Sequence, residues 1–215
     1  MRGFGWMLGL ALFAVGCETT KQERVRAYND DGVELFQKGD YGNARESFQA
    51  ALALKPNDSG LLFDRGECYD RLGAVAQAEQ DYRACLKELP KHVPCRHALV
   101  ALLVKAHRES EAQPLVNDWI AQEPKSAAAY AEDGYLLRMR GDLPRAQYRI
   151  QQALDLDSHD ERALTEMALT YEALNHNDRA LALYEKILDR KPGEAQVVDR
   201  VNFLLAKGAK QPHPE

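Results

Sequence analysis

Small, aromatic and proline residues recur along this chain of 215 residues at a fixed spacing of 34. Prolines stand at positions 56, 90, 124 and 192, and Ser158 fills the slot between the last two. Alanines occupy a second slot at every repeat: Ala44, Ala78, Ala112, Ala146 and Ala180. A fixed period of this length predicts stacked helix-turn-helix units rather than one globular core.

Two further slots of the same period explain how the two helices of a unit would pack. Gly32, Gly66 and Gly134 hold the first, and Val100 and Ala168 depart from it. Apolar side chains hold the second: Phe48, Tyr82, Val116, Ile150 and Tyr184. Small residues let two helix backbones approach, aromatic residues fill the adjacent gaps, and proline ends the second helix. Because each unit leaves an apolar face bare, neighbouring units must stack.

The apolar positions continue beyond the last repeat. Residues 195–207 (AQVVDRVNFLLAK) predict an amphipathic helix with no partner helix, which we expect to cover the final unit. Residues 208–215 then predict a disordered tail.

These slots resemble the tetratricopeptide repeat (TPR). Its pattern fits well in the first unit through Tyr28, Gly32, Phe48 and Pro56, whereas the third unit is degenerate and keeps little beyond Ala112 and Pro124. The resemblance implies an all-α fold, a right-handed superhelix of five repeats and a C-terminal capping helix. The units expected over residues 25–194 are 25–58, 59–92, 93–126, 127–160 and 161–194.

The N-terminus predicts a lipoprotein signal. Residues 1–16 combine a short positive start with about twelve apolar or glycine positions, too few to span a bilayer of roughly 30 Å. The ending Ala14-Val15-Gly16-Cys17 resembles a bacterial lipobox, which implies diacylation of Cys17. An ordinary secretory signal and an uncleaved segment are the alternatives. Residues 17–24 would then be the lipidated cysteine and a short stalk.

The residue after Cys17 indicates the location of the protein, and the net charge of the chain limits its partners. Glu18 is not the inner-membrane retention aspartate of enteric lipoproteins, so the resemblance favours an outer-membrane protein facing the periplasm. Removal of Arg2 with the signal would change the net charge from −5 to −6. Mild acidity without a basic stripe argues against nucleic-acid binding.

The three remaining cysteines are Cys68, Cys85 and Cys95. Cys85 holds a slot that is alanine elsewhere, so it is either a small core residue or one half of a disulfide with Cys95. The chain turns at Pro90 between them, and an oxidising compartment would permit the bond.

Candidate chemistry is sparse. His92, Cys95 and His97 lie within six residues, but a structural zinc site needs four ligands, so we expect no metal site and no cofactor. The acidic stretch 155–161 lacks calcium-loop spacing, and Asp157 or Ser158 is interpreted as a helix N-cap. No nucleophile, metalloprotease or phosphate-loop motif is present, so the chain is predicted not to be an enzyme.

A concave groove is the remaining candidate site. In TPR domains the first helices of successive units line such a groove, and the resemblance carries this role to a set of apolar and polar positions here: Asn29, Val33, Phe36, Phe63, Glu67, His97, Ala101, Val104, Tyr135, Arg138, Met139 and Leu169. Apolar side chains that face water mark a binding site. The alternative is that tight closure or the capping helix buries some of them.

The groove composition narrows the kind of partner. The slots with which some TPR domains grip a C-terminal carboxylate hold Asn29, Val33, Asp64, Pro94 and Ala98, of which one matches. We therefore expect an amphipathic helix or an extended apolar segment of a partner protein.

Two functional classes follow. The first is a non-enzymatic adaptor lipoprotein of the bacterial envelope that binds a partner during assembly of an envelope complex. Within it, the chain resembles the pilotins of type IV pilus and secretion-system secretins. The second class is an accessory regulator of a cell-wall enzyme.

Overall fold

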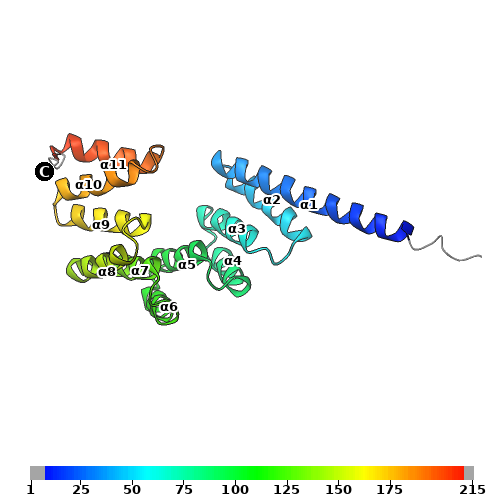
Figure 1. Ribbon diagram of the computed structural model, residues 1–215, viewed down its shortest axis with the longest axis horizontal. Coiled ribbons are helices and arrows are strands. Elements are labelled where there is room, and N and C mark those ends of the chain that lie inside the picture. The colour runs from blue at the N-terminus through cyan, green and yellow to red at the C-terminus, as the bar shows by residue number, and fades with distance from the viewer. Residues whose placement is uncertain (1–7, 211–215) are drawn as a thin grey trace, which may run out of the picture. The chain divides into compact units, whose positions relative to one another are not determined.

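The computed structural model describes the backbone of residues 8–210 and the side chains of residues 20–210. Every regular element in that range is an α-helix, as Figure 1 shows. The eleven helices of the described residues are α1 (Leu8–Gln37), α2 (Tyr41–Leu54), α3 (Ser59–Arg71), α4 (Val75–Glu88), α5 (Val93–Lys105), α6 (Glu109–Gln122), α7 (Ala127–Met139), α8 (Leu143–Leu156), α9 (Glu161–Ala173), α10 (Asn177–Leu188) and α11 (Ala195–Ala206).

The helix starts follow the period of the sequence. The helices α3, α5, α7 and α9 begin 34 residues apart, and so do α2, α4, α6, α8 and α10. The residue before each of α3, α5, α7 and α9 is an N-cap whose side chain accepts a backbone N–H three residues later: Asp58, His92, Ser126 and Asp160. Such caps satisfy one of the unpaired N–H groups at the helix start.

The cap of α9 differs from our expectation. Asp160, rather than Asp157 or Ser158, accepts the N–H of Ala163, at 2.8 Å. The carboxylate of Asp157 instead accepts the N–H of His159 within the preceding turn, at 2.9 Å. Asp157 itself follows the last residue of α8, so it lies too early in the chain to reach the first turn of α9.

Close helix contacts occur at the predicted small residues. A Cβ on Gly66 of α3 would lie 2.7 Å from Cε1 of Tyr82 on α4, which is inside van der Waals contact. Gly32 and Phe48 repeat this arrangement between α1 and α2. Glycine is therefore required at these crossings for packing.

The chain divides into two compact units, residues 1–106 and 107–215. The division falls between α5 and α6, inside the third repeat, where the sequence pattern is weakest. The first unit has a core of buried side chains from α2 to α5, which includes Phe48, Leu62 and Cys85. The second unit has buried clusters around Ile150 and around Tyr184.

The helix α1 extends beyond the first predicted repeat. It begins at Leu8 and continues without a break through residue 25, so the expected stalk 17–24 is helical. Residues 1–7 of the predicted signal lie outside the described residues, and the side chain of Cys17 is not described. Within the described part of the chain, no helix has both the length and the apolarity to cross a bilayer.

At the other end, α11 packs on α10 and buries Leu204 completely, in line with the expected capping helix. Residues 208–210 are not a disordered tail. Ala209 is buried, and the backbone N–H of Lys210 donates to the carboxylate of Asp178 at 2.8 Å. The positive φ of Gly208 ends α11 and turns the chain back onto α10. Residues 211–215 of the predicted tail lie outside the described residues.

Candidate functional site

Three helices of the first unit enclose an apolar cavity of about 350 Å³. Val33 and Phe36 approach it from α1, Phe48 from α2, and Phe63 from α3. Residues 33, 36 and 37 share one face of α1 because they lie three or four positions apart. The cavity therefore brings together four of the predicted groove residues, Val33, Phe36, Phe63 and Glu67.

Aromatic contacts hold the side of this cavity formed by α1 and α3. The ring of Phe36 lies edge-on to Tyr41 at 5.1 Å, and the guanidinium of Arg71 stands 5.7 Å from the centre of each ring. Phe63 lies 5.7 Å from the ring of His92 at the start of α5. These contacts orient the two phenylalanines without filling the space between them.

The polar part of the cavity is acidic. Burial raises the pKa of Asp64 to about 6, and the nearby charges of Glu67 and Asp58 add to the effect. Among the described residues no cation forms an ion pair with Asp64. Glu67 accepts a hydrogen bond from the hydroxyl of Tyr82 at 2.6 Å, and burial together with this contact raises the pKa of that tyrosine. The cavity thus presents a carboxylate whose charge is not balanced.

The sequence analysis placed Asp64 in a groove slot, that of the carboxylate-gripping pattern, but did not assign Phe48 to the groove. Phe48 was interpreted only as a packing residue, although it also lines the cavity. Asp64 lies three residues before Glu67, so the two carboxylates share one face of α3. This three-residue spacing was the feature of the sequence that could have indicated a pair of carboxylates in the cavity.

The other predicted groove residues of the first unit do not join this cavity. Val104 is only 5 % exposed and belongs to the core, because it faces inward from α5. His97 and Ala101 are half-buried on the same helix. Asn29 lines a different cavity of about 470 Å³, beside Arg26 of α1 and Lys55 after α2.

In the second unit, the predicted groove residues surround a network of ion pairs. The ring of Tyr135 lies 4.6 Å from the guanidinium carbon of Arg162 and 5.8 Å from that of Arg138. Arg138 Nε donates to the buried carboxylate of Glu166 at 2.7 Å. Burial raises the pKa of Tyr135. These charges pair with one another, although Nε and Nη2 of Arg162 are buried without a hydrogen-bond partner among the described residues.

The two apolar groove residues of the second unit differ in exposure. Met139 is 49 % exposed at the end of α7, whereas Leu169 is half-buried on α9.

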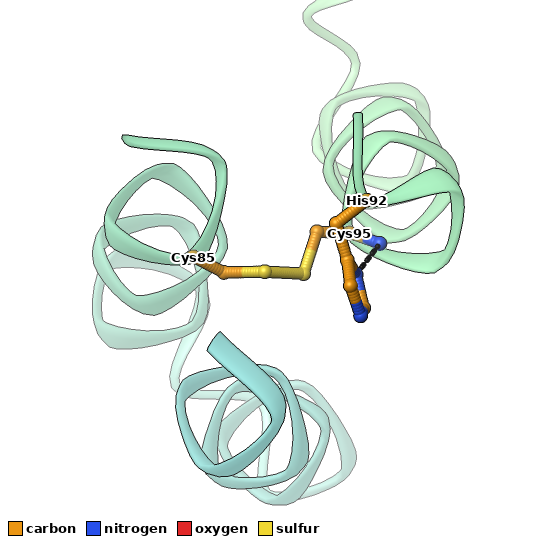
Figure 2. Close-up of side chains that lie close together, drawn as sticks. All are labelled: Cys85, His92 and Cys95. Atoms are coloured by element: carbon orange, nitrogen blue, oxygen red, sulfur yellow. Dashed lines mark hydrogen bonds between the residues drawn. A yellow bond between two sulfur atoms is a disulfide. The ribbon is translucent and has the colours of Figure 1, made fainter. Parts of the chain in front are cut away.

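A disulfide joins α4 to α5 between Cys85 and Cys95, as Figure 2 shows. The bond spans ten residues of sequence with a Cα–Cα distance of 6.6 Å, and both cysteines are fully buried. The two alternatives for Cys85, a small core residue or one half of a disulfide, are therefore both correct, because the bonded cysteine is also buried in the core. Cys68 is the free, buried thiol.

One group of potential metal ligands lies within the described residues. Sγ of Cys85, a ring nitrogen of His92 and Sγ of Cys95 are all within 4.8 Å of one another. The sequence had grouped His92 and Cys95 with His97, but the fold brings Cys85 to them instead. Nδ1 of His92 accepts the backbone N–H of Cys95 at 3.1 Å, so the imidazole is also the cap of α5.

Comparison with known proteins agrees with this architecture. Models of the tetratricopeptide repeat match residues 30–92 and 137–199. A crystal structure of a thermophilic TPR protein from Thermus thermophilus is similar with a TM-score of 0.69 at 22% identity, covering 85% of this chain and 99% of that one. This likeness concerns the fold alone.

Curated relatives are similar over parts of their length. Outer dynein arm-docking complex subunit 4 of Danio rerio is 45% identical over 51 residues, which are 24% of this chain and 10% of that protein. Protein FlbA of Caulobacter vibrioides is 24% identical over 187 residues, which are 86% of this chain and 31% of that protein. The chain thus spans about a tenth to a third of the length of these relatives. The expected fold class is confirmed: the chain is built of tetratricopeptide repeats, in the all-helical fold of TPR proteins.

Proposed function

We propose that this chain is a non-enzymatic scaffold that holds a segment of a partner protein in the cavity between α1, α2 and α3. TPR folds are typically protein-interaction scaffolds rather than enzymes. The observation that carries the proposal is an apolar cavity of about 350 Å³ with an unbalanced carboxylate at Asp64. Apolar surface that remains open on a folded repeat domain is a common mark of a binding site.

The chemistry of the cavity indicates the chemistry of the partner segment. Its apolar side chains would pack against Val33, Phe36 and Phe63, and a lysine or arginine would pair with Asp64. Full burial of one large apolar side chain contributes ~1.5–3 kcal/mol. An apolar segment with one cation is therefore the proposed ligand.

The proposed location is the outer membrane, with a lipid on Cys17 and the repeats facing the periplasm. The resemblance of residues 14–17 to a lipobox supports this proposal. Because α1 runs through residues 17–24, the helix would separate lipid from repeats by about 1.5 Å per residue. Seven residues then span roughly 10 Å, rather than the ~25 Å of an extended stalk. The cavity would work close to the membrane surface.

A pull-down from solubilised native envelopes tests the binding proposal. Wild-type protein is compared with Phe63→Asp, which puts a charge in the cavity, and with Val33→Asp, whose side chain is already 38 % exposed. Tyr148→Asp is the matched control, because Tyr148 is 64 % exposed on α8 and does not line the cavity. Circular dichroism verifies that each variant is folded.

We expect the wild type and Tyr148→Asp to capture the same partner, and both cavity variants to lose it. Equal capture by a folded Val33→Asp would show that the cavity is not the binding surface. The partner also separates the finer proposals. A secretin would support a pilotin role, a cell-wall enzyme would support an accessory regulator, and other envelope subunits would support a general assembly scaffold.

A further inference from the structure

The disulfide region contains three soft or borderline donors in one place. Cys85 lies near the end of α4, His92 caps α5, and Cys95 is the third residue of α5. Their donor atoms lie within 4.8 Å of one another. Figure 2 shows that Cys85 faces the two residues at the start of α5 across the gap between helices. The proposed protein-binding function uses only His92 of this cluster, whose ring lies 5.7 Å from that of Phe63.

The distances suit a shared metal ion after the sulfur–sulfur bond opens. Two thiolates at about 2.3 Å from one ion lie roughly 4 Å apart in a trigonal arrangement. The Cα–Cα distance of 6.6 Å between the cysteines already permits close approach of their sulfurs. Side-chain rotation is therefore sufficient, and neither helix needs to move far.

Cys95 lies at a helix start, and both cysteines lie in an apolar core. Cys95 is in the first turn of α5, where its backbone N–H donates to Nδ1 of His92 at 3.1 Å and the helix dipole favours negative charge. Both cysteines are fully buried within the core of the first unit, which includes Leu61 and Leu62. An ion that neutralises part of the thiolate charge would lower the cost of burying it.

We propose that Cys85, His92 and Cys95 form a binding site for monovalent copper once their disulfide is reduced. A dithiol reductant supplies two electrons and two protons to the sulfur–sulfur bond and becomes a disulfide itself. Two cysteine thiols result. One cuprous ion then binds both sulfurs and the imidazole, and the two thiol protons pass to solvent.

The number and type of donors select the metal. Soft thiolates favour Cu(I) and Zn²⁺, and Cu(I) is stable with two or three ligands. Structural zinc is held by four ligands, and a three-ligand zinc site keeps a water in its fourth position. Here both cysteines are fully buried and only His92 is partly exposed, so the sulfur side of the site offers little room for that water. Two thiolates and one imidazole therefore match copper.

Metal binding and helix capping compete at His92. In the neutral imidazole only one ring nitrogen has a free lone pair, and Nδ1 uses it to accept the N–H of Cys95. Copper must take that lone pair, or the ring must change tautomer. In both cases the cap of α5 is lost. His92→Asn separates the two roles, because asparagine is a good N-cap and its amide oxygen is a hard, weak ligand for copper.

The test is a titration of protein that has been reduced with a phosphine under nitrogen. A cuprous salt is added in competition with a chromophoric copper chelator, and the air-oxidised protein is titrated in parallel. Cys85→Ser, Cys95→Ser and His92→Asn remove one donor each. Cys68→Ser is the matched control, because burial raises the pKa of Cys68 to about 12 and this thiol lies outside the donor group.

We expect one copper per reduced chain, with an affinity that falls by at least about 100-fold in each donor variant and is unchanged in Cys68→Ser. The oxidised protein should bind none. Full affinity in His92→Asn, equal binding by the oxidised protein, or binding of Zn²⁺ without Cu(I) would each overturn the proposal. His92→Asn retains the disulfide and the cap, so its result holds even where a serine variant fails to fold.

Discussion

At the scale of single residues, the turn inside each helix pair contains one position with a positive φ. Glycine holds it in three repeats, and histidine and asparagine hold it in the other two: Gly39, Gly73, His107, Gly141 and Asn175. A residue with a side chain pays about 1–2 kcal/mol for this left-handed conformation. His107 is at the division between the compact units, so this conformational free energy destabilises the third repeat, whose sequence pattern is the most degenerate.

His107→Gly should stabilise the protein by about 0.5–1 kcal/mol. The substitution removes the left-handed penalty at φ 56, and the larger entropy of glycine in the unfolded chain offsets only part of the gain. Urea unfolding followed by circular dichroism measures the change. Gly73→Ala is the reverse control and should destabilise, since its φ is 74. A lower midpoint for His107→Gly would contradict this account.

Asp64→Asn should remove a pH dependence of stability. The folded pKa of Asp64 is about 6 against an ordinary value of 3.8, so between these values the folded state binds more protons than the unfolded state. Stability therefore falls as the pH rises from about 4 to about 6.

At pH 7 the variant should be more stable than wild type by about 1 kcal/mol, a value reduced for solvent screening at the cavity mouth. Thermal melts at pH 4, 5, 6 and 7 compare the two proteins. The account fails if wild type and variant show parallel pH profiles.

At the scale of helices, the crossings within pairs depend on the absence of a Cβ. Gly66 faces Tyr82, which is fully buried and donates to Glu67, so the ring cannot move away without the loss of that hydrogen bond. The same relation between a small residue and a large one sixteen positions later was visible in the sequence. The hydrogen bond that holds the ring was not visible there.

Gly66→Ala should destabilise the first unit by about 1–3 kcal/mol, because the new methyl group would lie 2.7 Å from the tyrosine ring. Gly42→Ala is the matched control in α2, where the nearest atom is 3.9 Å away, and alanine should be neutral or stabilising there. Guanidinium unfolding of both variants gives the comparison. Equal stability of the two would show that the crossing tolerates a side chain.

At the scale of the whole molecule, the proposed lipid anchor and the proposed binding cavity both involve α1. The structure places α1 from Leu8, and residues 25–37 of that helix belong to the first repeat. The proposed lipid on Cys17 would therefore sit on the same helix that lines the cavity through Val33 and Phe36.

Cys17→Ala should move the protein from the membrane fraction to the soluble periplasmic fraction. A single acyl chain binds membranes only marginally, whereas two chains give stable anchoring. Loss of the modified cysteine removes both chains, so we expect membrane anchoring to be lost completely. Fractionation and immunoblotting measure the distribution. Cys68→Ala controls for the loss of a cysteine as such. A variant that stays in the membrane fraction would refute the lipid anchor.

Much of the fold was predictable from local sequence, because each repeat uses the same few residues at the same spacing. The period located the helix pairs and the glycine crossings, and the amphipathic pattern of residues 195–207 located the final helix, since all of them depend on residues near one another in the chain. The four N-caps also recur every 34 residues, so the same period indicates Asp160, whereas our interpretation of Asp157 or Ser158 as the cap of α9 did not use it.

The candidate sites depended on contacts between distant positions. The sequence by itself determined the repeat, the helices and the set of residues on inner faces. Only the tertiary structure decided which of these residues remain available to a partner. Phe63 lines a cavity with Asp64, whereas Val104 is buried in the core and Arg138 forms an ion pair with Glu166. The tertiary structure also placed Cys85 rather than His97 beside Cys95. The physical reason is that burial and pairing are set by the neighbouring helices, whose approach the period alone does not specify.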